Sequence, residues 1–150
     1  MPIRLARPAP DAYAYPLLIK QLLHTPLATA ATREIVYRDR VRYTYADFPR
    51  RLGRLGNALK DLGVEQGTTV AVMDWDSHRY LECYFAIPML GAVLQTVNVR
   101  LAPQEILFTL KDSGAQVILV FDTTGKVLKE VHLPARKAMR KDKKDKKDKD

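Results

Sequence analysis

The stretch from Thr69 to Val120 alternates short apolar runs with amphipathic helical patterns, and this alternation constrains the fold most strongly. Strands that alternate with helices of this length are typical of crossover connections and a parallel sheet. Val70–Met73 and Val117–Phe121 are continuous apolar runs, so we expect their strands to be buried on both faces. The predicted elements are the strands Thr69–Asp74, Ala92–Val97 and Gln116–Phe121 and the helices Arg79–Leu90 and Pro103–Asp112.

A β-hairpin and a long helix are predicted ahead of this sheet. Glu34–Arg38 and Val41–Tyr45 are rich in β-branched and aromatic residues, and a short polar turn separates them. From Thr44 to Leu62, apolar residues recur at steps of four and three, which places them on one helix face, and either Thr44 or Asp47 can cap the start. The predicted fold class is therefore α/β: a hairpin followed by a βαβαβ, mainly parallel sheet.

Within these helices, some residues carry narrower expectations. Gly53 and Gly56 in the Thr44–Leu62 helix suggest close packing against a neighbour, because each glycine costs a helix roughly 1 kcal/mol relative to alanine. The Arg79–Leu90 helix is amphipathic, and the residues of its apolar stripe are Leu81, Tyr84, Phe85 and Met89.

The domain organisation follows from composition. Residues 1–15, with three prolines, are expected to be a flexible lead-in, and residues 16–122 form the predicted domain. A short helix over Pro16–Leu23, with Leu18 and Leu22 on its apolar side, should end at Pro26. Residues 123–135 show no clear period, and residues 136–150 should be a disordered Lys/Asp tail.

Charge and cysteine usage limit the compartment and the partners. No apolar run is long enough to span a bilayer, the N-terminus lacks the apolar segment of a signal peptide, and Cys83 is the only cysteine, so we expect a cytoplasmic protein. Of the formal charge of +8, residues 136–150 contribute nine Lys or Arg against four Asp. These interspersed Asp residues and the lack of aromatic side chains for base stacking make nucleic-acid binding the least favoured hypothesis.

Several segments, in this order and spacing, resemble the N-terminal region of the AMP-forming acyl-CoA synthetases, in the adenylate-forming ligase superfamily. The resemblance runs from about Pro16 to Asp122 and leans towards the medium- and long-chain fatty-acid branch. The segments that carry it are Glu34–Asp39, Tyr43–Phe48, Arg54–Leu59, Leu62–Gly67, Val70–Glu82, Tyr84–Leu94 and Asn98–Glu105.

The resemblance implies a fatty acid–CoA ligase that uses Mg-ATP and CoA. ATP and a fatty acid give an acyl-adenylate and pyrophosphate, and CoA then displaces AMP. The family's Ser/Thr/Gly-rich phosphate loop ending in Pro-Lys is absent from this sequence, as are its adenine, ribose and metal motifs. We therefore interpret the chain as a truncated or internally deleted ligase that keeps the N-terminal subdomain, is inactive alone and binds none of these cofactors.

Thr123–Lys129 is similar to a Thr-x-x-Gly-Lys-x-x-Lys stretch near the family's C-terminus. By this resemblance alone, Lys126 aligns with a catalytic lysine that approaches the adenylate. The alternative is a plain loop leading into the basic tail. Gly125-Lys126 lacks the earlier glycine of a Walker A loop, which excludes that motif.

His78 follows a predicted strand and opens a helix, a usual position for a binding residue in an open α/β sheet. A metal or acid/base site with Asp74 or Glu82 is one interpretation. We favour the other, a polar turn in which Asp76 or Ser77 caps the helix.

The other polar candidates show no site pattern. No spacing of His, Cys and Asp matches a metal signature, and Ser77, Ser113 and Cys83 lack a nucleophile motif. We expect Cys83 in the core and His24 and His132 at the surface.

An interaction module is the second functional hypothesis. An isolated N-terminal subdomain would expose faces and sheet edges that pack against the rest of a ligase, so it could self-associate or bind a full-length relative. A fatty acid would bind only if a site survives in this chain.

Overall fold

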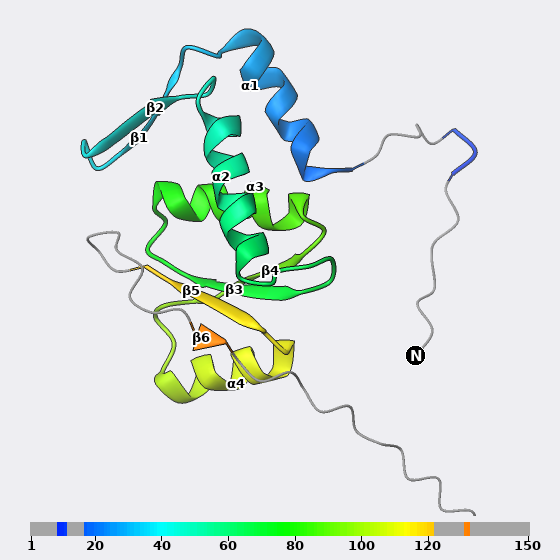
Figure 1. The fold of residues 1–150 in the computed structure, drawn as a ribbon, viewed down its shortest axis with the longest axis vertical. Coiled ribbons are helices and arrows are strands. Elements are labelled where there is room, and N and C mark those ends of the chain that lie inside the picture. Colours follow the sequence, from blue (N-terminus) through cyan, green and yellow to red (C-terminus); the bar gives the residue numbers. More distant parts are fainter. Residues whose placement is uncertain (1–8, 12–16, 122–130, 133–150) are drawn as a thin grey trace, which may run out of the picture.

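The computed structural model describes residues 9–11, 17–121 and 131–132, which form a mixed α/β fold (Figure 1). Between residues 17 and 121 lie two short helical segments, a hairpin, and alternating strands and helices. In chain order the elements are η1 (Ile19–Leu23), α1 (His24–Thr29), β1 (Glu34–Tyr37), β2 (Val41–Thr44), α2 (Phe48–Asp61), β3 (Thr69–Met73), α3 (His78–Met89), β4 (Val93–Thr96), α4 (Pro103–Ser113), β5 (Val117–Val120) and β6 (Val131–His132).

The central sheet has the strand order β4-β3-β5-β6. β3 pairs in parallel with β4 and β5, so that Val70 lies opposite Leu94 on one side and Val117 on the other. β6 pairs antiparallel with β5 and lies in a segment where the sequence shows no period. The predicted βαβαβ, mainly parallel sheet is confirmed.

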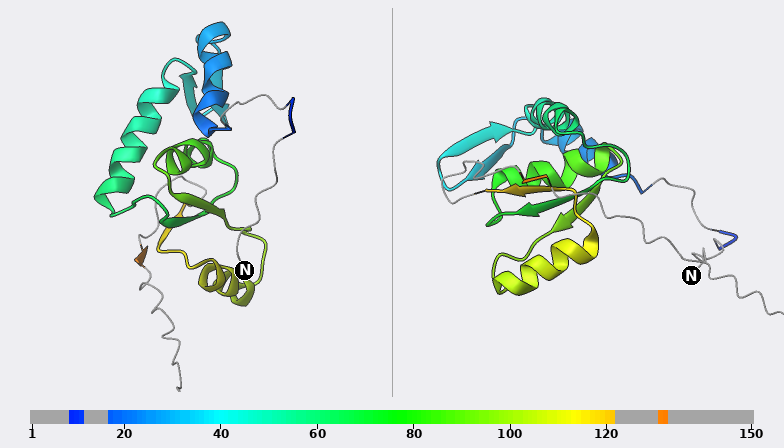
Figure 2. Two further views of the ribbon diagram at one scale, coloured as in Figure 1. Left: turned by 90° about the vertical axis from the view of Figure 1, so that its right-hand side faces the viewer. Right: turned by 60° about the horizontal axis from the view of Figure 1, so that its bottom comes forward.

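Helices cover both faces of this sheet (Figures 1 and 2). α2 and α3 pack against each other on one face, which we call the upper layer. α4 lies on the opposite face, the lower layer. The connection through α3 leads from β3 to β4, and the connection through α4 leads from β4 past β3 to β5. Consecutive crossovers therefore pass on opposite sides of the sheet.

The hydrophobic core divides along the same two layers. Val70, Ala71 and Val72 of β3 are fully buried, which confirms that the strand is covered on both faces. Val70 and Val72 belong to the upper cluster with Phe48, whereas Ala71 belongs to the lower cluster. The lower cluster is small, and its other buried members are Val97, Leu110, Ala115 and Ile118.

The hairpin of β1 and β2 is antiparallel, as predicted, and places Glu34 opposite Thr44. Its turn gives positive φ angles to Arg38 (48°) and Asp39 (53°), and the Arg40 N–H donates to the Tyr37 carbonyl at 3.0 Å. Positive φ at both central residues of a four-residue turn is characteristic of type I′, the turn that matches the twist of paired strands.

The expected N-terminal helix was wrong in its end and in its buried side chains. η1 continues directly into α1, and Pro26 is the third residue of α1. A proline in the first helical turn removes no intrahelical hydrogen bond, which is why it does not end the helix. Leu18 is half exposed and Leu22 is 64% exposed, and Leu23 is the buried side chain.

Both residues expected to cap α2 take part in its start. The Asp47 carboxylate accepts from the Thr44 hydroxyl at 2.8 Å, and the Asp47 N–H donates to the Thr44 Oγ1 at 3.3 Å. Of the two glycines in α2, Gly56 is buried and faces Leu90, whereas Gly53 is exposed with nothing near it. The expectation of close packing therefore holds for Gly56 only.

α4 begins after Ala102, which has no side-chain oxygen to cap the helix. The Glu105 carboxylate accepts from the Ala102 N–H at 3.1 Å, and this satisfies one exposed donor. Gly114, with φ of 65°, ends the helix in the left-handed conformation that glycine adopts most easily.

Candidate functional site

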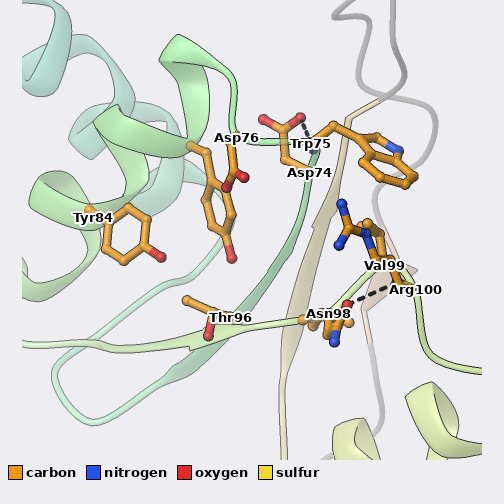
Figure 3. A pocket seen from close by; sticks show the side chains of 10 residues that line it. Asp74, Trp75, Asp76, Tyr84, Thr96, Asn98, Val99 and Arg100 are labelled. Carbon is orange, nitrogen blue, oxygen red and sulfur yellow. Dashed lines mark hydrogen bonds between the residues drawn. The ribbon is translucent and has the colours of Figure 1, made fainter.

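A crevice opens at the carboxyl ends of β3 and β4. The chain leaves β3 towards α3 in the upper layer and leaves β4 towards α4 in the lower layer, so the two loops diverge. Such a switch point is where open α/β sheets bind ligands. The crevice has a volume of about 390 Å³ and is lined by Asp74, Trp75, Asp76, Tyr80, Tyr84, Thr96, Val97, Asn98, Val99 and Arg100 (Figure 3).

The turn after β3 fixes one wall of the crevice. The buried Asp74 carboxylate accepts from the Trp75 N–H at 2.6 Å and from the Ser77 hydroxyl. The Ser77 Oγ in turn accepts from the Arg79 N–H at 3.1 Å and caps α3. Asp76 between them has a positive φ of 53°. The favoured interpretation, a polar turn with a helix cap, is confirmed with Ser77 as the cap, and Asp74 serves the turn.

The opposite wall comes from the loop after β4. The Arg100 N–H donates to the Asn98 Oδ1 at 2.9 Å, which shapes the loop. The Arg100 guanidinium lies 6.0 Å from the centre of the Trp75 ring, within the range of a cation–π contact across the mouth. Trp75 is half exposed, so its ring is open to a ligand.

Two tyrosines from α3 line the inner part. The Tyr80 and Tyr84 rings lie 5.0 Å apart, and the Tyr84 hydroxyl end faces the crevice with Thr96 nearby (Figure 3). Burial raises the pKa of Tyr80 to about 12, which keeps its hydroxyl neutral and able to donate. Tyr84, expected in an apolar stripe, is 42% exposed instead, and Met89 is 47% exposed.

Together these groups can bind a ligand but do not form a catalytic set. The crevice offers aromatic faces, one guanidinium, and amide and hydroxyl groups. Its buried carboxylate, Asp74, is already bonded within the turn. Among residues 9–11, 17–121 and 131–132, no cluster of three or more His, Cys, Asp or Glu side chains could hold a metal ion.

His78 does not line the crevice. Its ring is buried beside the hairpin, 5.4 Å from the Tyr37 ring and 6.3 Å from the Tyr43 ring. Burial lowers the pKa of His78, so the imidazole is neutral near pH 7. Within the described part of the chain its Nδ1 has no hydrogen-bond partner, and His78 belongs to no group of three or more His, Cys, Asp or Glu side chains that could hold a metal ion.

A second polar group that the sequence does not reveal lies next to His78. Arg51 of α2 donates from Nε to the Glu82 carboxylate of α3 at 2.6 Å, and its guanidinium lies 4.4 Å from the Tyr43 ring centre. Burial, with Glu82 nearby, raises the pKa of Tyr43 to about 12. These contacts join α2, α3 and the hairpin.

The remaining candidates take structural or surface positions. Cys83 is fully buried, and burial raises the pKa of its thiol to about 12, so it remains a protonated core residue. The Ser113 hydroxyl donates to the Gln95 side chain at 2.5 Å, and His24 is exposed. Lys126 and the Thr123–Lys129 stretch lie outside the described residues, as does the His132 side chain.

Comparison with known proteins identifies the family. The model of the family described as AMP-binding enzyme matches residues 21–150. The chain belongs to the AMP-binding enzyme family. Its structural neighbours are acyl-CoA synthetases, and their shared fold is that of the N-terminal part of adenylate-forming ligases.

Individual relatives agree with this assignment. A long-chain-fatty-acid–CoA ligase of Thermus thermophilus is 45% identical over 78 residues, which cover 52% of this chain and 14% of that protein. A structure described as a long-chain-fatty-acid CoA ligase of Rhodopseudomonas palustris superposes with a TM-score of 0.62 and 30% identity, over 69% of this chain and 26% of that one.

A third similar protein is named for a different acid, anthranilate. An anthranilate CoA ligase in complex with anthranoyl-AMP superposes with a TM-score of 0.62 and 29% identity, over 68% of this chain and 20% of that one. The chain therefore spans only about a seventh of the Thermus enzyme and a fifth to a quarter of these two structures. Among the residues that the structure describes, each helix is too short or too polar to cross a membrane.

Proposed function

We propose that this chain is the N-terminal subdomain of an AMP-forming fatty acid–CoA ligase and acts as a scaffold rather than as a catalyst alone. The observation that carries the proposal is the crevice between β3 and β4, whose side chains suit binding, in a member of the AMP-binding enzyme family. The parent reaction joins a carboxylate to AMP with loss of pyrophosphate, and CoA then replaces AMP to give the thioester.

The charge that develops in this reaction explains why the chain alone would be inactive. Adenylate transfer needs Mg²⁺ and cationic groups placed around the phosphates. The sequence contains no Ser/Thr/Gly-rich phosphate loop, and the crevice supplies a single arginine, Arg100. The parent enzyme would bind Mg-ATP and CoA largely through other segments, and this chain by itself would bind none of them.

Within a complete ligase, the crevice would form one wall of a shared site. Trp75 and Tyr84 offer partly exposed aromatic faces, and Asn98 and Arg100 offer polar groups on the opposite side. We propose that the protein is cytoplasmic, because its free, buried Cys83 suits a reducing compartment.

The direct test is pyrophosphate release by the purified chain with Mg-ATP, a fatty acid and CoA. We expect no release above background. ATP-dependent pyrophosphate release would contradict the scaffold proposal and make Lys126, which resembles a catalytic lysine of the family, the first residue to mutate. An amide NMR titration with Mg-ATP completes the test: peaks that do not move support the scaffold, and shifts near Lys126 oppose it.

A second candidate function is a non-catalytic interaction module that binds itself or a full-length relative. The observation that favours it is the outer side of α4, where Leu107 is 50% exposed and Phe108 is 68% exposed. Light scattering should then report a dimer that Phe108→Ser converts to a monomer. A monomer that does not bind a full-length relative would contradict this second function. Nucleic-acid binding is not expected.

A further inference from the structure

A second pocket of about 390 Å³ lies between α2 and α3, next to the end of β5. Its charged residues are Arg51 and Arg54 from α2 and Arg79 and Glu82 from α3. Leu55, Cys83 and Phe121 supply the apolar part of its lining. None of these residues lines the crevice between β3 and β4, so the two pockets are separate.

The pocket carries an excess of positive charge. Three arginines, whose guanidinium groups stay protonated in proteins, line the pocket together with a single carboxylate. That carboxylate, on Glu82, is bonded to Arg51 at 2.6 Å. Within the described part of the chain, neither Arg54 nor Arg79 forms an ion pair. The excess is therefore about two positive charges at one concave site.

Arg51 is held in place before any ligand arrives. Its Nε is bonded to Glu82, whose side chain is only 9% exposed, and its guanidinium rests on the Tyr43 ring. Because the salt bridge uses Nε, the two terminal nitrogens of Arg51 take no part in it. An arginine whose rotamer is already fixed loses less entropy when it binds an anion.

The lining beneath the arginines is apolar. Cys83 is fully buried and Phe121 is 9% exposed, while Leu55 is partly buried against the same cluster. A small inorganic anion would contact only the arginines. A molecule that fills the pocket would place an oxyanion at the guanidinium groups and an apolar body over this lining.

We infer that the pocket between α2 and α3 binds an amphiphilic oxyanion, a small molecule with a carboxylate or phosphate head and an apolar body. Arginine suits both head groups, because its planar fork can donate two parallel hydrogen bonds to either. This site stands apart from the crevice and does not depend on the proposed function, since it needs neither ATP nor the missing phosphate loop.

The test uses the full 150-residue chain and four probes: octanoate, octyl phosphate, octan-1-ol and inorganic phosphate. Binding is followed by amide NMR and calorimetry. We expect octanoate, octyl phosphate or both to shift signals of α2, α3 and Phe121, and the difference between them identifies the preferred head group. Octan-1-ol and inorganic phosphate should bind at least about tenfold more weakly.

Variants locate the site. Arg54→Gln and Arg79→Gln should each weaken binding of the better amphiphile by roughly tenfold, about 1.4 kcal/mol. Arg50→Gln is the matched control, because Arg50 is also on α2 but pairs with Asp47 and does not line the pocket. It should bind as tightly as the wild type.

Several results would overturn the inference. These are no binding of either amphiphile, equally tight binding of octan-1-ol, shifts confined to other elements, or equal losses in Arg50→Gln and Arg54→Gln. If an arginine variant does not fold, the wild-type chain still decides the question. Added salt must weaken octanoate or octyl phosphate binding while leaving octan-1-ol binding unchanged, and an affinity independent of salt would contradict an anion site.

Discussion

The two layers that cover the sheet are built very differently. The upper layer consists of α2 and α3, against which η1 and the hairpin pack, and its buried cluster includes Phe48, Leu59 and Ile87, each at most 1% exposed. The lower layer has one helix, α4, in which Leu110 is the only buried residue while Leu107 and Phe108 face outward. Both layers rest on the same three parallel strands, so the contrast comes from the helices.

This contrast indicates where the fold obtains its stability. A large apolar cluster buried on one face contributes most of the favourable free energy, because that term grows with the apolar area removed from water. The upper layer also contains the Arg51–Glu82 salt bridge and the buried His78. In the lower layer, the start of α4 has a single side-chain hydrogen bond, from the Ala102 N–H to the Glu105 carboxylate. We therefore expect substitutions to separate the layers by size of effect.

The largest expected effect is in the upper core. Phe48→Ala should lower the free energy of unfolding by about 4 kcal/mol, because the ring is 1% exposed and packs edge-to-face on Phe85 at 5.3 Å. Leu110→Ala in the lower layer should cost about 2 kcal/mol, near the low end for such substitutions. Urea unfolding of both variants measures the two free energies, and equal losses would contradict the proposed difference in stability between the layers.

The next effect concerns the ion pair within the upper layer. Glu82→Gln should cost about 2 kcal/mol, because it leaves the partly buried Arg51 without its carboxylate. Glu34→Gln is the control, since its partner Arg42 and Glu34 itself are half exposed, and it should change stability by less than about 0.5 kcal/mol. Chemical unfolding at pH 7 compares the two, and a large loss in the control would argue against a special role for the pair.

A smaller effect should appear on acidification. Burial and the nearby Arg79 lower the pKa of His78 in the folded chain, while Glu82 and Asp74 oppose this shift and Arg51 adds to it. Below about pH 6.5, the unfolded chain then binds a proton that the folded chain does not, so stability present above that pH is lost as pH falls. His78→Gln should flatten this part of the stability profile, measured by urea unfolding from pH 7.5 to 5. An unchanged slope would contradict the assignment to His78.

The smallest effect is a gain in the lower layer. Ala102→Ser should stabilise the chain by roughly 1 kcal/mol, because a serine hydroxyl can accept from the unpaired N–H groups of the first turn of α4. Ala58→Ser, inside α2 and exposed, is the control and should instead cost about 0.5 kcal/mol. Thermal unfolding of both variants tests this, and a loss for Ala102→Ser would refute the capping argument.

Much of the fold was predictable because its signals are local. β3, β5 and α2–α4 each carry their own period, and glycines mark several of the breaks, so the predicted ranges and the structure differ by a few residues at most, the largest being at the start of α2. The prediction that the first helix ends at Pro26 was wrong because proline is compatible with the first turn of a helix. The sequence does not show that α1 starts at His24, which places Pro26 in such a turn.

The site was less predictable because it depends on distant contacts. His78 was singled out for its place after a strand, but Tyr37 and Tyr43, far earlier in the chain, bury it. Tyr84 shares a helical stripe with Leu81 and Phe85, and only the divergence of the loops after β3 and β4 leaves it open to the crevice. Asn98–Arg100 directly follows the predicted strand Ala92–Val97, and this position at a strand end is the signal that could have located the crevice.

The central place of β3 has a consequence for synthesis on the ribosome. Val70 pairs with Leu94 on one side and with Val117 on the other, so β3 is fully paired only after both of these later segments have been synthesised. A nascent chain that stops before β5 leaves an apolar strand with an open edge, the feature that favours aggregation. The open edge of β3 can be paired only once Gln116–Phe121 has left the exit tunnel. Slow translation just before that point would therefore lengthen the time during which this edge can aggregate.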